Sequence, residues 1–407
     1  MPSTYLSFRC SVLWLILSLE AVFIVCSYFL FSDRHILSYS DRTITYLAWQ
    51  DVSHMLIFGF GFFLMFLKRY SFSSVGFNLL IIVLGVQCSL LMQNVSVFLK
   101  EGKLKGSLES LIEAAMSMVA VIISIGAVLG KTNPMQSIVM TIVEIIVFCM
   151  SRWINTYILE VSNHVSMMHV HLFGAYFGLA VSSRFSEPSP RAEKNASTPK
   201  SDLLSMLGTL FLWVFWPSFN SALIVEKHKV IFNTCLALAV SAVTAFALSG
   251  LITKDGKFRM THIHSAALAG GVTVGYAAES IEYPWIAMIL GLLASVMSIL
   301  GSLCLQSCLH PTLKIHDASG VHFTFGLPAV FGALAQVLLC VIETKSLSFD
   351  CEVILNIGAI CFTISVALIT GLITGLILNL KLLKPIPVSK YFEDQMYWEF
   401  PHLAVGF

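Results

Sequence analysis

Long apolar runs separated by short polar connectors make up most of the chain. A helix needs about 20 predominantly apolar residues to cross the hydrocarbon core of a bilayer. Runs of this length predict twelve membrane-spanning helices, at Ser11–Phe31, Gln50–Leu67, Gly76–Leu99, Leu108–Gly130, Met135–Leu159, His164–Ser183, Asp202–Ile224, Val230–Ile252, His262–Glu279, Pro284–Leu305, Phe323–Ile342 and Val353–Leu380. The second, sixth and ninth runs are short or carry polar residues. The pattern predicts an all-α membrane protein.

The connectors and chain ends complete the predicted layout. The longest internal connector, Arg184–Ser201, is rich in Ser, Pro and charge and is expected to be a surface loop. Ser11–Phe31 is too long for a signal-peptide core and lacks a small-residue cleavage site, so it is expected to remain as the first span. The chain therefore divides into a membrane domain, residues 1–380, and a C-terminal tail, residues 381–407.

Lysine and arginine positions predict the orientation of the chain. With twelve spans, both ends lie on the same side of the membrane. That side holds most of the lysine and arginine residues of the connectors. Because cytoplasmic loops are enriched in these residues, both termini and the tail are predicted to be cytoplasmic.

Composition and motifs narrow the functional class. Apolar residues make up 57% of the chain and charged residues 12%, whereas soluble domains contain about 25% charged residues. The net charge of +1 gives no indication of nucleic-acid binding. The ten cysteines have no metal-like or paired spacing. Phosphate-binding, dinucleotide-binding, nucleophile-elbow and His-Glu-x-x-His motifs are missing. No enzymatic activity, metal or cofactor is predicted.

Ionisable rings lie in the middle of the sixth apolar run. His169 and His171 are two positions apart, and helical geometry turns them about 200° away from each other. Only one of them can therefore line a pore. His171 shares a helix face with His164, Gly174 and Gly178. An imidazole at this depth favours a transport path, and the alternative is a core histidine bonded to a neighbouring helix.

Charged side chains also lie within apolar runs. Glu144 and Arg152 are about two helical turns apart, too far for direct pairing but within reach of partners on a neighbouring helix. Two interpretations remain open. Carboxylates of this kind serve proton relays in transporters, and they also hold helices together in membrane bundles.

Several segments resemble the ammonium transporter and Rh family, and within it the Rh blood group branch. The matching segments are Gly126–Lys131, Phe173–Leu179, Phe211–Trp213, Phe215–Ala222, Leu268–Val272 and Phe400–Phe407. The resemblance implies an ammonium transporter-like fold with two inverted five-helix halves, a closing helix and an extra N-terminal span. It also implies a trimer with one pore per protomer.

The resemblance assigns pore-lining positions residue by residue. Conducting members carry two adjacent histidines, two gating phenylalanines and an entrance aspartate. His171 matches the first histidine, and Phe219, two residues past the helix-breaking or kinking Pro217, matches the second phenylalanine. The second histidine position holds Phe325, the first phenylalanine position Ile125, and the aspartate position Asn163.

The phenyl group at position 325 decides between the functional interpretations. Two adjacent imidazoles share a proton and offer nitrogen atoms to ammonia, whereas a phenyl ring offers neither donor nor acceptor. A displaced imidazole from His322, one turn earlier, is the alternative source of a second nitrogen. Phe325 favours a structural subunit with a degenerate pore. Retention of His171 and Phe219 favours a working ammonia or carbon dioxide channel, and an intramembrane enzyme has only scattered carboxylates in its favour.

The resemblance also implies partners and location. It implies the erythrocyte plasma membrane, a trimer with an Rh-associated glycoprotein-like homologue, and attachment to the membrane skeleton (ankyrin) through cytoplasmic ends. The tail, Lys381–Phe407, mixes charged with aromatic side chains. This composition suits a docking segment, or a segment that lies on lipid headgroups.

Overall fold

A computed structural model describes residues 3–30, 42–93, 107–186, 196–253, 255–305, 315–343 and 351–399. Every regular element within these ranges is helical. The long helices are α1 (Ser3–Leu30), α2 (Arg42–His54), α4 (Ser71–Gln93), α6 (Leu108–Ala127), α7 (Pro134–Tyr157), α8 (Asn163–Ser182), α9 (Pro199–Ser221), α10 (Lys227–Ile252), α11 (Met260–Ala277), α12 (Pro284–Leu300), α14 (Leu327–Glu343) and α15 (Cys351–Leu378). Short segments are η1 (Met55–Phe60), α3 (Gly61–Phe63), η3 (Gly301–Leu305), η4 (His322–Gly326), η5 (Lys381–Leu383), η6 (Val388–Lys390) and η7 (Asp394–Met396).

Ten helices in the described residues are long and apolar enough to cross a membrane. The predicted runs at Gln50–Leu67 and His262–Glu279 are also helical, as α2–η1–α3 and α11, but they are not among these ten. The chain is therefore an all-helical, multi-pass membrane protein. The predicted start at Gln50 is wrong by eight residues, because α2 begins in the polar stretch at Arg42.

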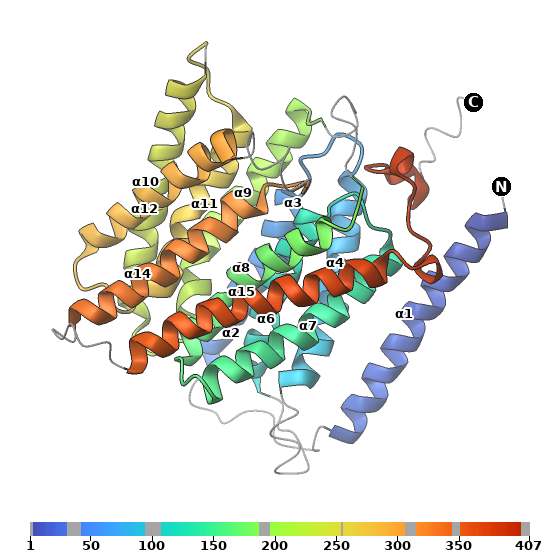
Figure 1. Ribbon diagram of the computed structural model, residues 1–407, viewed down its shortest axis with the longest axis horizontal. Helices are drawn as coiled ribbons and strands as arrows, with labels where there is room; N and C mark the ends of the chain where they lie inside the picture. Colours follow the sequence, from blue (N-terminus) through green and yellow to red (C-terminus); the bar gives the residue numbers. More distant parts are fainter. Residues whose placement is uncertain are drawn as a thin grey trace.

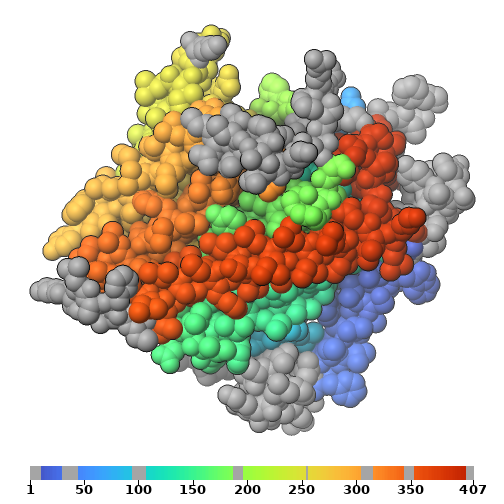
Figure 2. All heavy atoms as spheres, in the orientation of Figure 1, coloured from blue at the N-terminus to red at the C-terminus, as the bar shows by residue number. Residues whose placement is uncertain are grey.

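The helices form two groups that meet at α8 and α11 (Figure 1). In one group α8 packs against α6 and α15, and in the other α11 packs against α10, α12 and α14. Figure 2 shows α15 as a continuous ridge across one face, with the C-terminal segment beside its end. The N-terminal helix α1 lies at the edge of the bundle, where Glu20 accepts a hydrogen bond from Gln87 of α4 at 3.1 Å.

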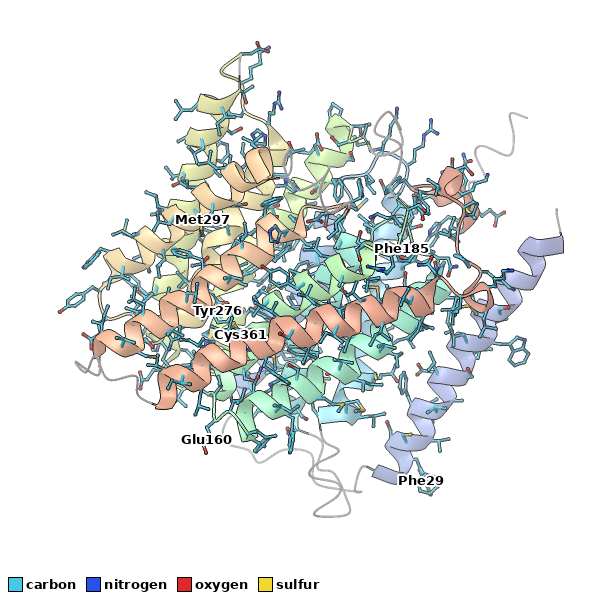
Figure 3. All side chains as sticks on the ribbon, in the orientation of Figure 1. Phe29, Glu160, Phe185, Tyr276, Met297 and Cys361 are labelled. Atoms are coloured by element: carbon cyan, nitrogen blue, oxygen red, sulfur yellow. The ribbon has the colours of Figure 1, made fainter. Side chains whose placement is uncertain are left out.

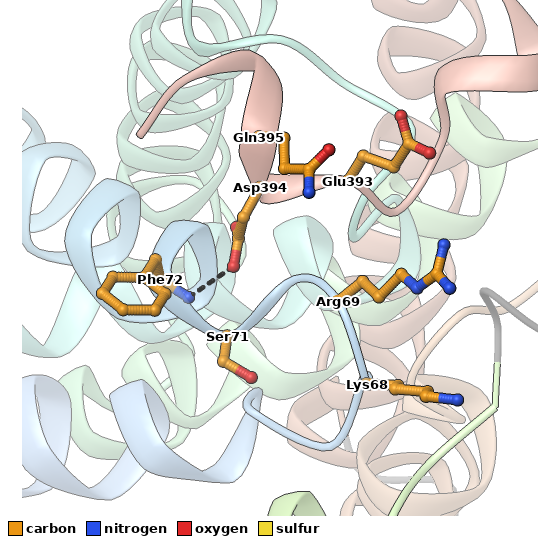
Figure 4. A pocket seen from close by; sticks show the side chains of 7 residues that line it. All are labelled: Lys68, Arg69, Ser71, Phe72, Glu393, Asp394 and Gln395. Atoms are coloured by element: carbon orange, nitrogen blue, oxygen red, sulfur yellow. Dashed lines mark hydrogen bonds between the residues drawn. The ribbon is translucent and has the colours of Figure 1, made fainter. Parts of the chain in front are cut away.

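The tail folds back onto the connections between helices. Asp394 caps the start of α4, where its carboxylate accepts hydrogen bonds from the backbone N–H groups of Phe72 at 2.8 Å and Ser73 at 2.9 Å. The indole of Trp398 donates to Ser73 Oγ at 2.9 Å, and the N–H of Phe392 donates to the carbonyl of Gly130 at 2.9 Å. The described part of the tail, up to residue 399, therefore docks on the chain's own bundle. Figure 4 shows the pocket of about 410 Å³ beside this cap.

Asp394→Ala is expected to loosen the tail and to lower the free energy of unfolding by about 1 kcal/mol, the usual cost of losing a helix cap. Limited proteolysis should cut the variant's tail faster than that of the native protein. Asp394→Asn is the matched control, because an amide oxygen still accepts from the same N–H groups. Equal proteolysis rates for the alanine variant and the native protein would contradict the capping role.

Candidate functional site

Helix α8 directs its two central histidines to different surroundings. His169 lies 3.1 Å from the Asn155 amide and 3.1 Å from the Thr363 hydroxyl, both through Nδ1. His171 faces Trp216 and other aromatic rings. The predicted divergence of the two side chains is confirmed, and of the two only His171 belongs to the ring cluster described next.

His171 lies in a cluster of aromatic side chains. Its ring stacks on Trp216 at 5.7 Å between centroids and meets the edge of Phe219 at 5.7 Å. Both partners come from α9, which continues through Pro217 to Ser221, so of the two predicted effects of this proline, a break or a kink, the structure excludes the break. His171 Nδ1 contacts the carbonyl of Met168 at 3.2 Å. The other ring nitrogen, Nε2, is buried and has no hydrogen-bond partner in the described part of the chain.

Phe325 occupies the centre of the same cluster. It comes from η4 and is 1% exposed, so its ring points into the bundle and away from lipid. It stacks nearly parallel to His171, with centroids 6.4 Å apart and an interplanar angle of 12°. Further ring contacts join it to Phe60 at 5.9 Å and Phe63 at 6.1 Å. The imidazole of His171 therefore faces a phenyl group.

Six buried side chains form what we call the aromatic plug, namely Phe60, Phe63, His171, Trp216, Phe219 and Phe325. Sequence reasoning missed Phe60, Phe63 and Trp216. Their spacing was the available signal, because Phe60–Phe63 and Trp216–Phe219 are pairs three residues apart on one helix face.

A cavity of about 290 Å³, lined by both polar and apolar residues, approaches the plug from the side of the tail. Its lining includes His262, His264, Asp317, Ser319 and Thr324. The ring of His264 contacts Phe63 of the plug, with 5.2 Å between centroids. We call this cavity the vestibule. Burial raises the pKa of the Asp317 carboxyl, which accepts hydrogen bonds from the N–H groups at the start of η4.

Ile125 lies away from the plug, although the resemblance assigns it to the first of the two gating positions and Phe219 to the second. Helices α6 and α8 run parallel and in close contact. A Cβ added to Gly174 would lie 2.8 Å from Ala120 Cα, and four residues further along both helices a Cβ added to Gly178 would lie 2.6 Å from Ser124 Cα. Ile125 is therefore level with residue 179, eight positions past His171. At 1.5 Å per residue this is about 12 Å along the axis.

Asn163 is the first residue of α8 and lies at the other end of that helix. Its side-chain oxygen accepts a hydrogen bond from Arg152 at 2.6 Å, and Arg152 pairs with Glu113 of α6 at 3.0 Å. Arg152 thus finds its partner on a neighbouring helix, as predicted. Glu144 accepts a short hydrogen bond from Ser124 of α6. These contacts tie α6, α7 and α8 together.

His322 faces a different part of the bundle from His171. Its ring contacts are with Tyr176 at 5.9 Å and Phe323 at 4.9 Å between centroids. The plug position opposite His171 belongs to Phe325. The sequence offered His322 as an alternative source of a second imidazole opposite His171. The described ring contacts place His322 beside Tyr176 and Phe323 instead.

Comparisons with known proteins identify the family of the chain. Residues 12–402 match the model of the Ammonium Transporter Family. The chain is 42% identical to an RH-like protein of Macaca mulatta and 40% identical to the Blood group Rh(D) polypeptide of Homo sapiens, each over 98% of both chains. A solved structure of Nitrosomonas europaea Rh50, described as a Rhesus-family channel, has a TM-score of 0.77 and 29% identity, covering 89% of this chain and 94% of that one. The chain belongs to the ammonium transporter family, among relatives named as Rh-like proteins and blood group Rh polypeptides.

Proposed function

We propose that this protein is an Rh blood group-type subunit of an oligomeric membrane complex whose own conduit is degenerate. The observation that carries this proposal is the position of Phe325, which fills the place opposite His171 with a buried, nearly parallel ring. The protein then serves mainly to form and position a complex.

The plug opposes the passage of ammonia and ammonium for different reasons. Ammonia needs hydrogen-bond partners along a narrow path, and a phenyl ring supplies none. Ammonium must in addition lose its hydration, which costs several kcal/mol without a compensating charge. The nearest described carboxylate to the entrance position Asn163 is that of Glu113, which is already paired with Arg152.

A working ammonia or carbon dioxide channel is the second candidate function. Two observations favour it. The vestibule reaches His264, directly against the plug, and His171 Nε2 has no hydrogen-bond partner in the described residues. A small neutral molecule moving past the rings would meet one free nitrogen atom there.

The proposed assembly is a trimer of twelve-span protomers. Ten spans follow from length and apolarity, and α2–η1–α3 and α11 complete the twelve. Helices α2–η1–α3, α4, α6, α7 and α8 would form one five-helix half, α9, α10, α11, α12 and α14 the inverted other half, and α15 the closing helix. We propose an Rh-associated glycoprotein-like homologue as the trimer partner, because a complex-forming subunit needs a pore-competent one for transport.

Both termini are proposed to be cytoplasmic in the erythrocyte plasma membrane. Lys384 of the tail donates a hydrogen bond to Ser11 near the start of α1 at 3.2 Å, which supports a common side for the two ends. Figure 1 draws the start of α1 and the described part of the tail on the same side of the bundle. Attachment to the membrane skeleton through ankyrin would use this side.

Proteoliposomes that contain this protein alone are expected to take up methylamine, a substitute for ammonia, no faster than protein-free vesicles. Phe325→His should raise the rate, because it restores a second imidazole opposite His171. Phe325→Met is the control, since it keeps an apolar side chain of similar volume and adds no nitrogen. Uptake should be followed by the internal pH change.

Two results would favour the channel instead. One is fast uptake by the native protein that His171→Leu abolishes. The other is equal uptake by the native protein and Phe325→His, both well above protein-free vesicles. Either result would show that the phenyl group does not close the conduit.

A further inference from the structure

A second row of polar side chains crosses the bundle on the opposite face of α8 from the plug. His169 and Tyr176 are seven residues apart and therefore share this face. At the level of His169, three side chains from three helices are linked. The Asn155 amide donates to Thr363 at 3.0 Å, and both groups lie 3.1 Å from His169 Nδ1.

Tyr276 of α11 adjoins this group. Its ring lies 5.7 Å from that of His169 between centroids, and the residue is 1% exposed. Figure 3 marks Tyr276 within the body of the bundle, away from its ends. The hydroxyl oxygen is buried and has no hydrogen-bond partner in the described ranges. Such a group costs free energy unless water or another polar molecule satisfies it.

Toward the tail side, the row continues through Tyr176 to His322. The two rings are 5.9 Å apart, and His322 Nδ1 is another buried atom without a partner among the described residues. The backbone N–H of His322 donates to Asp317 at 2.9 Å. Since Asp317 lines the vestibule, this end of the row reaches that cavity. The raised pKa of Asp317 brings its proton exchange closer to neutral pH.

Toward the other side, a second group of linked polar side chains lies on α7 and at the start of α8. Thr156 donates to Ser166 at 3.1 Å, and Ser166 donates to the carbonyl of Arg152 at 3.3 Å. Arg152 is paired with Glu113, whose side chain is 25% exposed. This end of the row therefore reaches a carboxylate that is open to the surroundings.

We propose that these side chains form a hydrated path for protons that is separate from the aromatic plug. We call it the polar row, and it comprises Thr156, Ser166, Asn155, His169, Thr363, Tyr276, Tyr176 and His322. Water molecules would bridge the positions where Tyr276 Oη and His322 Nδ1 have no protein partner. The proposal concerns another face of α8, so it does not rest on the degenerate pore.

The chemistry of the row fits protons better than other ions. Hydroxyl and imidazole groups donate on one side and accept on the other, which lets a proton enter at one end while another leaves at the far end. No bond to carbon changes and no oxidant is required. The charged groups that face the row are Glu113 and Arg152 at one end, and Asp317 with Lys131 near the other. The guanidinium of Arg152 disfavours metal cations.

Tyr276→Phe tests the proposal directly, because it removes only the unpartnered hydroxyl. The native protein in vesicles should acidify the interior under a valinomycin-clamped potassium potential, as reported by pyranine, faster than protein-free vesicles. Tyr276→Phe should reduce this flux to the protein-free rate. Tyr283→Phe makes the same change at a tyrosine that is 60% exposed and should keep the native flux.

A purely structural role of Tyr276 would be detected as a lower melting temperature of Tyr276→Phe. Loss of the Tyr276 hydroxyl breaks no hydrogen bond to a described protein group, so the melting temperature of Tyr276→Phe should stay close to that of the native protein. The expected outcome is therefore a folded variant without proton flux. Native flux equal to that of protein-free vesicles, or unchanged flux in Tyr276→Phe, would overturn the polar row as a proton path.

Discussion

Gly208→Ala is expected to cause a severe loss of folded protein, because the backbones of α9 and α3 are in direct contact at this position. A Cβ on Gly208 would clash with the backbone N of Phe63, and it would lie 2.6 Å from Phe63 Cα and 2.7 Å from the carbonyl oxygen of Gly59. Backbone atoms cannot move aside as the end of a flexible side chain can. We expect a destabilisation of about 3 kcal/mol or more, with the Phe63 ring of the plug displaced.

The same substitution on α15 provides the control. Apart from the backbone of its own helix, no atom of the described residues lies within 4 Å of the Cβ position of Gly358. Alanine favours a helix over glycine by up to about 1 kcal/mol, so Gly358→Ala should be neutral or stabilising. Fluorescence-detected size exclusion and thermal melting in detergent measure both variants. A monodisperse Gly208→Ala protein with the native melting temperature would contradict the close crossing.

Hydrophobicity predicted where the membrane helices lie because the thickness of the bilayer fixes their length. The predicted limits Ile252 for α10 and Pro284 for α12 coincide with the structure. The start of α2 could not be found this way. Its first residues are polar, and an apolar run reports contact with lipid or core, not the point where backbone hydrogen bonding begins.

The candidate site was predicted only in part, for a geometric reason. His171 contacts both Phe219 and Phe325 in the structure. These three positions could be assigned from sequence because each lies within a well-marked segment. Ile125 was assigned from the adjoining Gly126, but neighbours across two helices depend on how the helices are aligned, which local spacing does not specify. The polar row was not predicted because its side chains come from five helical segments, α7, α8, α11, η4 and α15, most of which are far apart in sequence.

Lys131→Met is expected to destabilise the segment that leads into the plug. Lys131 is 1% exposed, and its ammonium donates to Ser182 Oγ at 2.8 Å and to the carbonyl of His316 at 2.6 Å. These bonds tie the α6–α7 connection and the end of α8 to the residues before η4. Hydrogen bonds to a charged group contribute about 1.5–3 kcal/mol each. We expect a loss of roughly 3 kcal/mol and faster hydrogen exchange in residues 316–326.

The pH dependence of this loss of stability distinguishes the effect of the Lys131 charge from the effect of its packing. Without Lys131 the buried Asp317 carboxylate loses a nearby positive charge, and its pKa, already raised by burial, should rise further. A carboxyl group whose pKa is higher in the folded than in the unfolded state destabilises the folded protein at high pH. This destabilisation decreases as the pH falls and the carboxylate becomes protonated. The deficit relative to the exposed control Lys257→Met should therefore shrink as the pH falls from neutral toward the ordinary range of a carboxyl pKa. A deficit that stays constant over this range would mean that Lys131 acts through packing alone.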